Sequence, residues 1–75
     1  MNKTRRAALD VIVSRIEDVR SDLDALKDEE QDYYDNMPES LQGSEKGEQA
    51  EETVSTLEDV SNNLGDAIDQ ISNVA

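Results

Sequence analysis

The chain contains neither cysteine nor histidine, and these two absences remove most of the chemistry available to a small protein. Without cysteine there is no disulfide, thiol nucleophile or thiolate ligand, and without histidine the commonest metal ligand and general base are missing. No glycine-rich phosphate loop is present, and only three of the 75 residues are glycine. The sequence therefore predicts no catalytic residue, no cofactor and no metal site, and we expect a protein that is not an enzyme.

Long apolar runs are also missing. The longest apolar stretches, 7–9 and 11–13, contain three residues each. A transmembrane helix needs about 20 apolar residues, and a signal peptide needs an apolar core of about 7–15. We therefore expect a cytoplasmic protein that does not bind membranes.

Positive charge is scarce, because seven basic residues stand against 19 acidic ones and the formal net charge is −12. Such a chain is repelled by nucleic acid and by anionic lipid, so neither is an expected partner. Any charged partner should be a basic protein, such as a host protein that itself binds nucleic acid.

What the sequence does contain is a coiled-coil period between residues 9 and 33. Apolar residues recur at alternating spacings of three and four, which predicts a helix over about residues 3–35. One track consists of Leu9, Ile16, Leu23 and the polar Glu30, and the other of Ile12, Val19, Leu26 and Tyr33. Tyr33 continues this pattern and is expected in the core, whereas Tyr34 is expected to point outward.

A second segment repeats the period and predicts a helix over about residues 45–73. Its tracks are Ala50, Leu57, Leu64 and Ile71, and Val54, Ser61, Ile68 and Ala75. The poor helix formers from Ser61 to Gly65 predict a bend or a close helix crossing. As polar residues at seam positions, Glu30 and Ser61 either lie at edges or fix the register between helices.

The connection is predicted at residues 36–44. Pro38 disfavours a helical conformation at Met37, Ser44 is a typical N-cap, and Leu41 is expected to pack beneath the loop. Two long helices joined by a short link favour an all-α, antiparallel two-helix hairpin forming a single domain over residues 1–75.

A single hairpin of this size cannot cover both apolar stripes, so we expect two copies to pair as a homodimer, in a four-helix bundle or coiled coil. The alternative is one hairpin docked on a different partner. The residues predicted to line the oligomer or partner seam are Leu9, Ile12, Ile16, Val19, Leu23, Leu26, Tyr33, Val54, Leu57, Leu64, Ile68 and Ile71.

Acidic residues are concentrated near the turn. Residues 28–52 contain ten acids and a single base, Lys46, whereas residues 1–27 carry a net charge of +1. We call the 28–52 region the acidic pole; it is either a solubilising surface or a contact for a basic partner. The residues predicted to make that contact are Asp28, Glu29, Asp32, Tyr34, Asp35, Glu39, Glu45 and Glu48.

Residues 28–45, and above all the turn Asn36-Met37-Pro38-Glu39, resemble a group of short phage and prophage proteins. Those proteins are similar in size and have a basic N-terminal helix before the turn and an acidic helix after it. The resemblance implies a phage or mobile-element origin, and hence the host cytoplasm. It carries no functional residues over to this chain.

Three functions compete. The first is a non-enzymatic protein–protein interaction module that acts as an oligomeric acidic hairpin. The second is a DNA-mimicking inhibitor of a host nucleic-acid-binding protein. Two paired hairpins would carry about 24 negative charges over roughly 50 Å, or about one per 2 Å, against one per about 1.7 Å in duplex DNA. The third is a small structural or scaffolding element of a virion.

Overall fold

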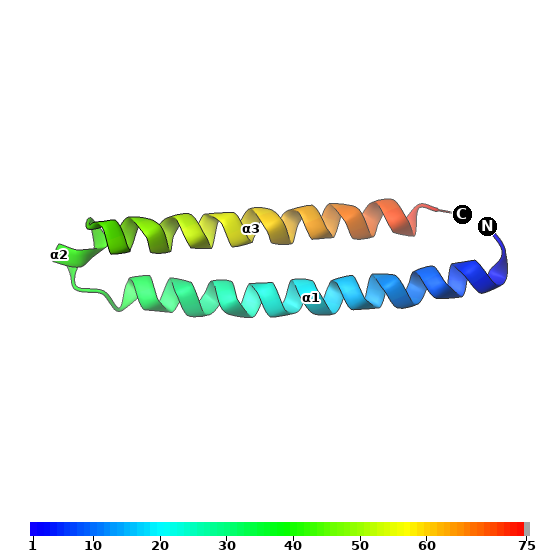
Figure 1. Ribbon diagram of the computed structural model, residues 1–75, viewed down its shortest axis with the longest axis horizontal. Coiled ribbons are helices and arrows are strands. Elements are labelled where there is room, and N and C mark those ends of the chain that lie inside the picture. Colours follow the sequence, from blue (N-terminus) through cyan, green and yellow to red (C-terminus); the bar gives the residue numbers. More distant parts are fainter. Residues whose placement is uncertain (75) are drawn as a thin grey trace.

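The computed structural model describes residues 1–74, and all regular structure in this range is helical. Two long helices, α1 (Lys3–Asp35) and α3 (Glu45–Ser72), lie antiparallel and are joined through the one-turn helix α2 (Glu39–Gln42) (Figure 1). The Cα trace measures 58 × 15 × 12 Å. The predicted all-α hairpin is confirmed, although Ala75, assigned above to the second track, lies outside the described residues.

Both long helices begin at a residue that suits the position. The Asn2 side chain accepts a hydrogen bond from the Arg5 N–H at 2.8 Å, which satisfies one of the free amides at the start of α1. Ser44 occupies the N-cap position of α3 in an extended conformation, as expected, but its hydroxyl donates to the Leu41 carbonyl instead of capping the helix. The observed ends, Asp35 and Ser72, match the predicted ones within one residue.

Only one of the two apolar tracks predicted for the first helix faces α3. The partly buried positions of α1 again alternate by three and four, but they combine the track of Leu9 with one that is mostly polar. This set consists of Leu9, Val13, Ile16, Arg20, Leu23, Lys27, Glu30 and Tyr34; Asp24 and Gln31, each next to a member of the set, are partly buried as well. The Ile12–Tyr33 track, predicted as part of the oligomer or partner seam, lies outside the contact between the two helices of the single hairpin.

Small residues of α3 explain how long polar side chains fit between the helices. Arg20 Nε donates to Ser61 Oγ at 3.1 Å, and a Cβ built on Gly65 would lie 2.9 Å from Arg20 Nη1. The aliphatic part of Arg20 can therefore cross α3 while its guanidinium reaches a polar partner. At residues 61–65, where the sequence predicts a bend or a close helix crossing, the structure shows the Arg20 side chain packed against α3, which continues without a break.

The turn packs through its backbone. A Cβ on Gly47 would lie only 2.0 Å from the Gln42 carbonyl oxygen, so α2 rests directly on the first turn of α3. Gln42 Nε2 also donates to the Tyr34 carbonyl at 3.2 Å. Because α2 approaches α3 at Gln42, Leu41 is turned away and stays 46% exposed, contrary to the prediction that it packs beneath the loop.

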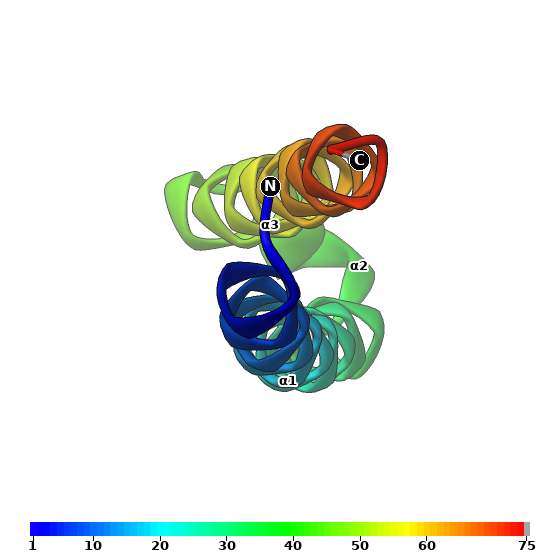
Figure 2. The ribbon, with the colours of Figure 1, turned by 90° about the vertical axis from the view of Figure 1, so that its right-hand side faces the viewer.

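The hairpin has almost no enclosed core. Among the described residues, only Gly47, Ala50 and Ser61 are buried, all of them in α3. The two long helices meet along one line and are inclined to each other when viewed end-on (Figure 2). The radius of gyration is 17.2 Å, against about 11 Å for a compact domain of this length. Most of the apolar surface is thus only partly covered within one chain.

Candidate functional site

An apolar stripe runs along the outside of α1. It consists of four residues at intervals of seven, which keeps them on one face of the helix. Their exposed fractions are 43% for Ile12, 51% for Val19, 54% for Leu26 and 50% for Tyr33. The interface with α3 thus leaves all four side chains about half exposed. We call these four residues the apolar stripe.

The two tyrosines are arranged opposite to the prediction. Tyr33 belongs to the stripe and is half exposed, whereas Tyr34 lies between the helices beside Gln31, Glu51 and Val54. A hydrogen bond to the Glu51 carboxylate raises the pKa of Tyr34 above its usual 10.0, and desolvation and the negative charges of Glu51 and Asp35 add to the effect. Tyr34 is therefore part of the packing between the helices and is not an outward contact of the acidic pole.

Two hollows adjoin the stripe, one towards each end of the molecule. The hollow near the termini is lined by Ile12, Arg15, Ile16 and Val19 of α1 and Leu64 of α3. The hollow near the turn is lined by Tyr33, Asn36, Met37, Pro38, Leu41 and Lys46. Since Ile12, Val19 and Tyr33 share one track, both hollows open on the same face of the hairpin.

One run of α3 positions on this face carries no charge, although Lys46 and Glu52 of α3 line hollows beside it. Leu64 lines the hollow beside the stripe, so the α3 positions just outside Leu57 and Leu64 continue the same face. They are Thr53, Thr56, Val60, Asn63, Ala67 and Gln70, together with Val74 just beyond the end of α3, and only Ala67 is partly buried. We call these residues the neutral strip. None of the eight acidic residues of α3 occupies one of these seven positions. A surface depleted of charged residues is typical of the centre of a protein interface.

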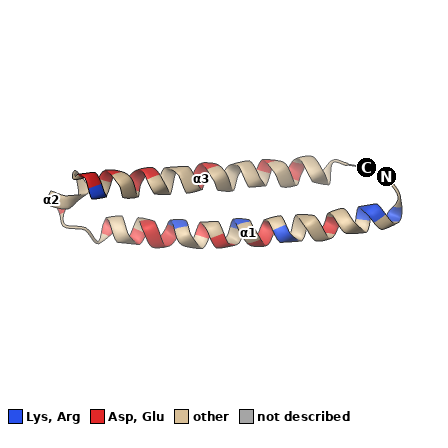
Figure 3. Cartoon of the chain, viewed as in Figure 1, with Lys and Arg blue, Asp and Glu red and all other residues tan. Residues whose placement is uncertain are grey.

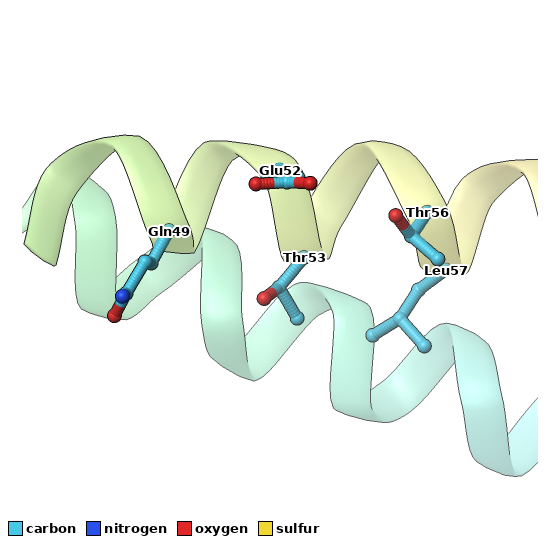
Figure 4. A pocket seen from close by; sticks show the side chains of 5 residues that line it. All are labelled: Gln49, Glu52, Thr53, Thr56 and Leu57. Carbon is cyan, nitrogen blue, oxygen red and sulfur yellow. The ribbon is translucent and has the colours of Figure 1, made fainter. Parts of the chain in front are cut away.

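A further hollow on this face lies on α3 alone. Its lining side chains are Gln49, Glu52, Thr53, Thr56 and Leu57, and Figure 4 shows them spread along one helix. Such a hollow surrounds no substrate from several sides, and its single carboxylate, Glu52, has no second acid or base in the lining. The geometry suits contact with another surface better than chemistry on a small molecule.

The predicted partner seam divides into two sets. Eight of its members lie partly buried between α1 and α3, where they hold the hairpin together: Leu9, Ile16, Leu23, Val54, Leu57, Leu64, Ile68 and Ile71. The other four are the apolar stripe. Sequence reasoning missed Val13, Arg20 and Lys27 as hairpin contacts. The sequence signal that could have revealed the Arg20 contact is the pair of small residues Ser61 and Gly65, which leave room for a long side chain from the opposite helix.

The acidic pole lies at the turn end of the hairpin (Figure 3). Every acid predicted for partner contact is exposed, namely Asp28, Glu29, Asp32, Asp35, Glu39, Glu45 and Glu48. Gln31 Nε2 donates to Asp35 Oδ1 at 2.9 Å, one turn along α1. Lys46 is the single base of this region, so the pole presents mostly unbalanced carboxylates to the solvent.

Within residues 1–74, no three His, Cys, Asp or Glu side chains come together as a potential metal site. The helices of the described chain are all too short or too polar to cross a membrane.

Comparison with known proteins returns no matching family model, no matching curated protein and no matching solved structure. A function for this chain must therefore be argued from its own surfaces.

Proposed function

We propose that this chain is a non-enzymatic protein–protein interaction module of phage or mobile-element type, working in the host cytoplasm as an oligomeric acidic helical hairpin. The observation that carries the proposal is the apolar stripe, a complete heptad track on α1 that α3 does not cover. The resemblance of the turn to short phage and prophage proteins supports the origin.

The stripe provides enough apolar surface to drive association. Complete burial of a Val, Leu, Ile or aromatic side chain contributes about 1.5–3 kcal/mol, so covering four half-exposed residues contributes roughly 3–6 kcal/mol. Exposed apolar side chains are common on protein surfaces, but they are usually scattered. Here they follow the coiled-coil period without interruption over 22 residues, from Ile12 to Tyr33.

DNA mimicry is a second candidate, and the acidic pole favours it. Its predicted contact acids are all exposed and lie together at the turn end of the hairpin. A mimic would bind a basic partner through carboxylates, so its binding should weaken steeply as salt screens the charges.

A capture experiment separates the two candidates. The tagged chain is incubated with bacterial lysate, washed at low and then at high salt, and bound proteins are identified by mass spectrometry. Wild type is compared with Val19→Asp on the stripe and with Ser21→Asp, an exposed control that adds the same charge elsewhere on α1.

An interaction module predicts bound protein, either further copies of the chain or another protein, that survives high salt. Val19→Asp should abolish this binding and Ser21→Asp should retain it. Recovery of a basic nucleic-acid-binding protein that elutes with salt and binds both variants equally would replace this proposal with mimicry.

A further inference from the structure

We propose that the partner covering the apolar stripe is a second copy of this chain, docked antiparallel so that the turn of each hairpin lies beside the termini of the other. This inference rests on the proposed function and names its partner and its geometry. The stripe and the neutral strip together form the contact face.

The accessible surface supports a partner of this size. The chain exposes 5566 Å². A globular protein of 8.3 kDa exposes about 4,600 Å². The excess of roughly 1,000 Å² per chain exceeds the about 800 Å² that each partner contributes to a standard interface. One further hairpin is therefore large enough to lower the exposed surface per chain to that of a globular protein of this mass.

The stripe is complementary to itself about a two-fold axis. An axis perpendicular to α1, crossing it midway between Val19 and Leu26, places Val19 level with Leu26 of the second copy. The same axis places Ile12 level with Tyr33 at both ends of the stripe. All four residues then find an apolar counterpart in one register.

Charge selects this arrangement over the parallel one. In the antiparallel register Arg15, which borders the stripe, lies level with Glu30 of the second copy and one residue from Glu29. In a parallel pair Arg15 would face Arg15, and Glu29 would face Glu29. Asp22 lies near its own counterpart in either arrangement and so does not distinguish them.

The acidic poles favour the same geometry. Residues 28–52 carry a net charge of −9, and the rest of the chain carries −3. A parallel pair would bring two −9 ends together within about 10–20 Å, about one to two Debye lengths at physiological ionic strength. An antiparallel pair places each acidic pole beside the end that contains Lys3, Arg5 and Arg6.

Distances between spin labels test the geometry directly. The chain has no cysteine, so one label can be placed at Ser40 in α2, or at Ser21 as a control near the centre of α1. Ser40 lies just beyond the end of α1, so Ser40 and its counterpart lie at opposite ends of the antiparallel pair, about 50 Å apart. In a parallel pair the same labels would lie within about 25 Å of each other, since packed helices are about 8–10 Å apart.

The expected result is a distance near 50 Å between the two Ser40 labels, together with a short distance between the two Ser21 labels. A short distance at both positions would overturn the antiparallel geometry while leaving self-association intact. Absence of any label–label distance, with a monomeric mass in sedimentation equilibrium, would overturn the second copy as the partner. The proposed interaction function would then depend on whether another protein is captured through Val19.

Exchanging two charges across the axis gives an independent check, measured by sedimentation equilibrium. Arg15→Glu should weaken the dimer about tenfold, and adding Glu29→Arg should restore most of the loss, because the two charges exchange places across the axis. Failure of the double variant to recover would also count against the antiparallel register. Both side chains are exposed in the single hairpin, so neither change should affect its helix content.

Discussion

At the scale of single residues, Tyr34 is the side chain whose chemistry the fold changes most clearly. Its phenol lies beside the Glu51 carboxylate of the opposite helix, although neither residue belongs to an apolar pattern. The neutral phenol can donate to that carboxylate, whereas a phenolate would be repelled by it. Packing between α1 and α3 thus favours the protonated tyrosine.

We expect Tyr34 to ionise above pH 10.0, its ordinary pKa. The Tyr33→Phe variant leaves Tyr34 as the only tyrosine, so its midpoint can be read from tyrosinate absorbance. Glu51→Gln in that background should lower the midpoint, and Glu29→Gln, which removes an acid elsewhere on the pole, should leave it nearly unchanged. Equal midpoints with and without Glu51 would show that the two side chains do not interact.

The phenol proton of Tyr34 also affects the stability of the fold at high pH. Because the folded chain holds the phenol proton more tightly than the unfolded chain, this contribution to the free energy of unfolding is fully present below pH 10. It is lost as the pH rises through the raised pKa of Tyr34. Alkaline unfolding of Tyr33→Phe, followed by circular dichroism, should therefore begin at lower pH when Glu51 is also replaced by Gln.

At the scale of elements, the contact between α2 and α3 makes the turn a defined structure. Gly47 lies where a side chain would meet the Gln42 backbone at 2.0 Å, whereas a side chain at Gly43 would meet nothing within 4 Å. Both glycines have negative φ, so backbone strain does not distinguish them. The close approach of the two helices alone makes Gly47 necessary.

We expect Gly47→Ala to lower the free energy of unfolding by about 1–3 kcal/mol, because the backbone of α2 must move away from α3. The matched control Gly43→Ala should be neutral or stabilise the chain by up to about 1 kcal/mol, since alanine restricts the unfolded chain more than glycine does. Urea unfolding followed by circular dichroism measures both. A Gly47→Ala variant as stable as Gly43→Ala would mean that α2 does not rest on α3 in solution.

The elements themselves were largely predictable from sequence. The helix boundaries at the turn follow from Pro38, which disfavours a helical conformation at Met37, and from Ser44, the residue before α3. The Asn2 cap of α1 was not predicted. The pairing of faces was less predictable. The stripe is more apolar than the track of Arg20 and Lys27, so a hydrophobic pattern ranks it first, yet α3 packs against the more polar track.

At the scale of the whole molecule, a net charge of −12 opposes self-association. Apolar burial along the stripe must exceed the repulsion between two chains of like charge. The repulsion extends about 30 Å at 0.01 M salt and only about 8 Å at 0.15 M. Salt should therefore strengthen a dimer held by the stripe, even though it also screens Arg15 from Glu29.

We expect the dimer dissociation constant to fall severalfold between about 0.02 and 0.3 M sodium chloride, as the Debye length shortens. Sedimentation equilibrium at several ionic strengths measures this, and Val19→Asp should remain monomeric throughout. A dissociation constant that rises with salt would indicate that ion pairs, not the stripe, hold the copies together.

The sequence by itself determined the helices, the turn and the uneven charge, because these depend on spacing, local backbone preferences and composition. Tertiary structure alone decided which face of α1 meets α3. That choice depends on shape across the interface, where Ser61 and Gly65 leave room for Arg20. Hydrophobic periodicity reports which side chains avoid water but not which surface covers them. The four residues of the stripe therefore remain exposed in the single hairpin.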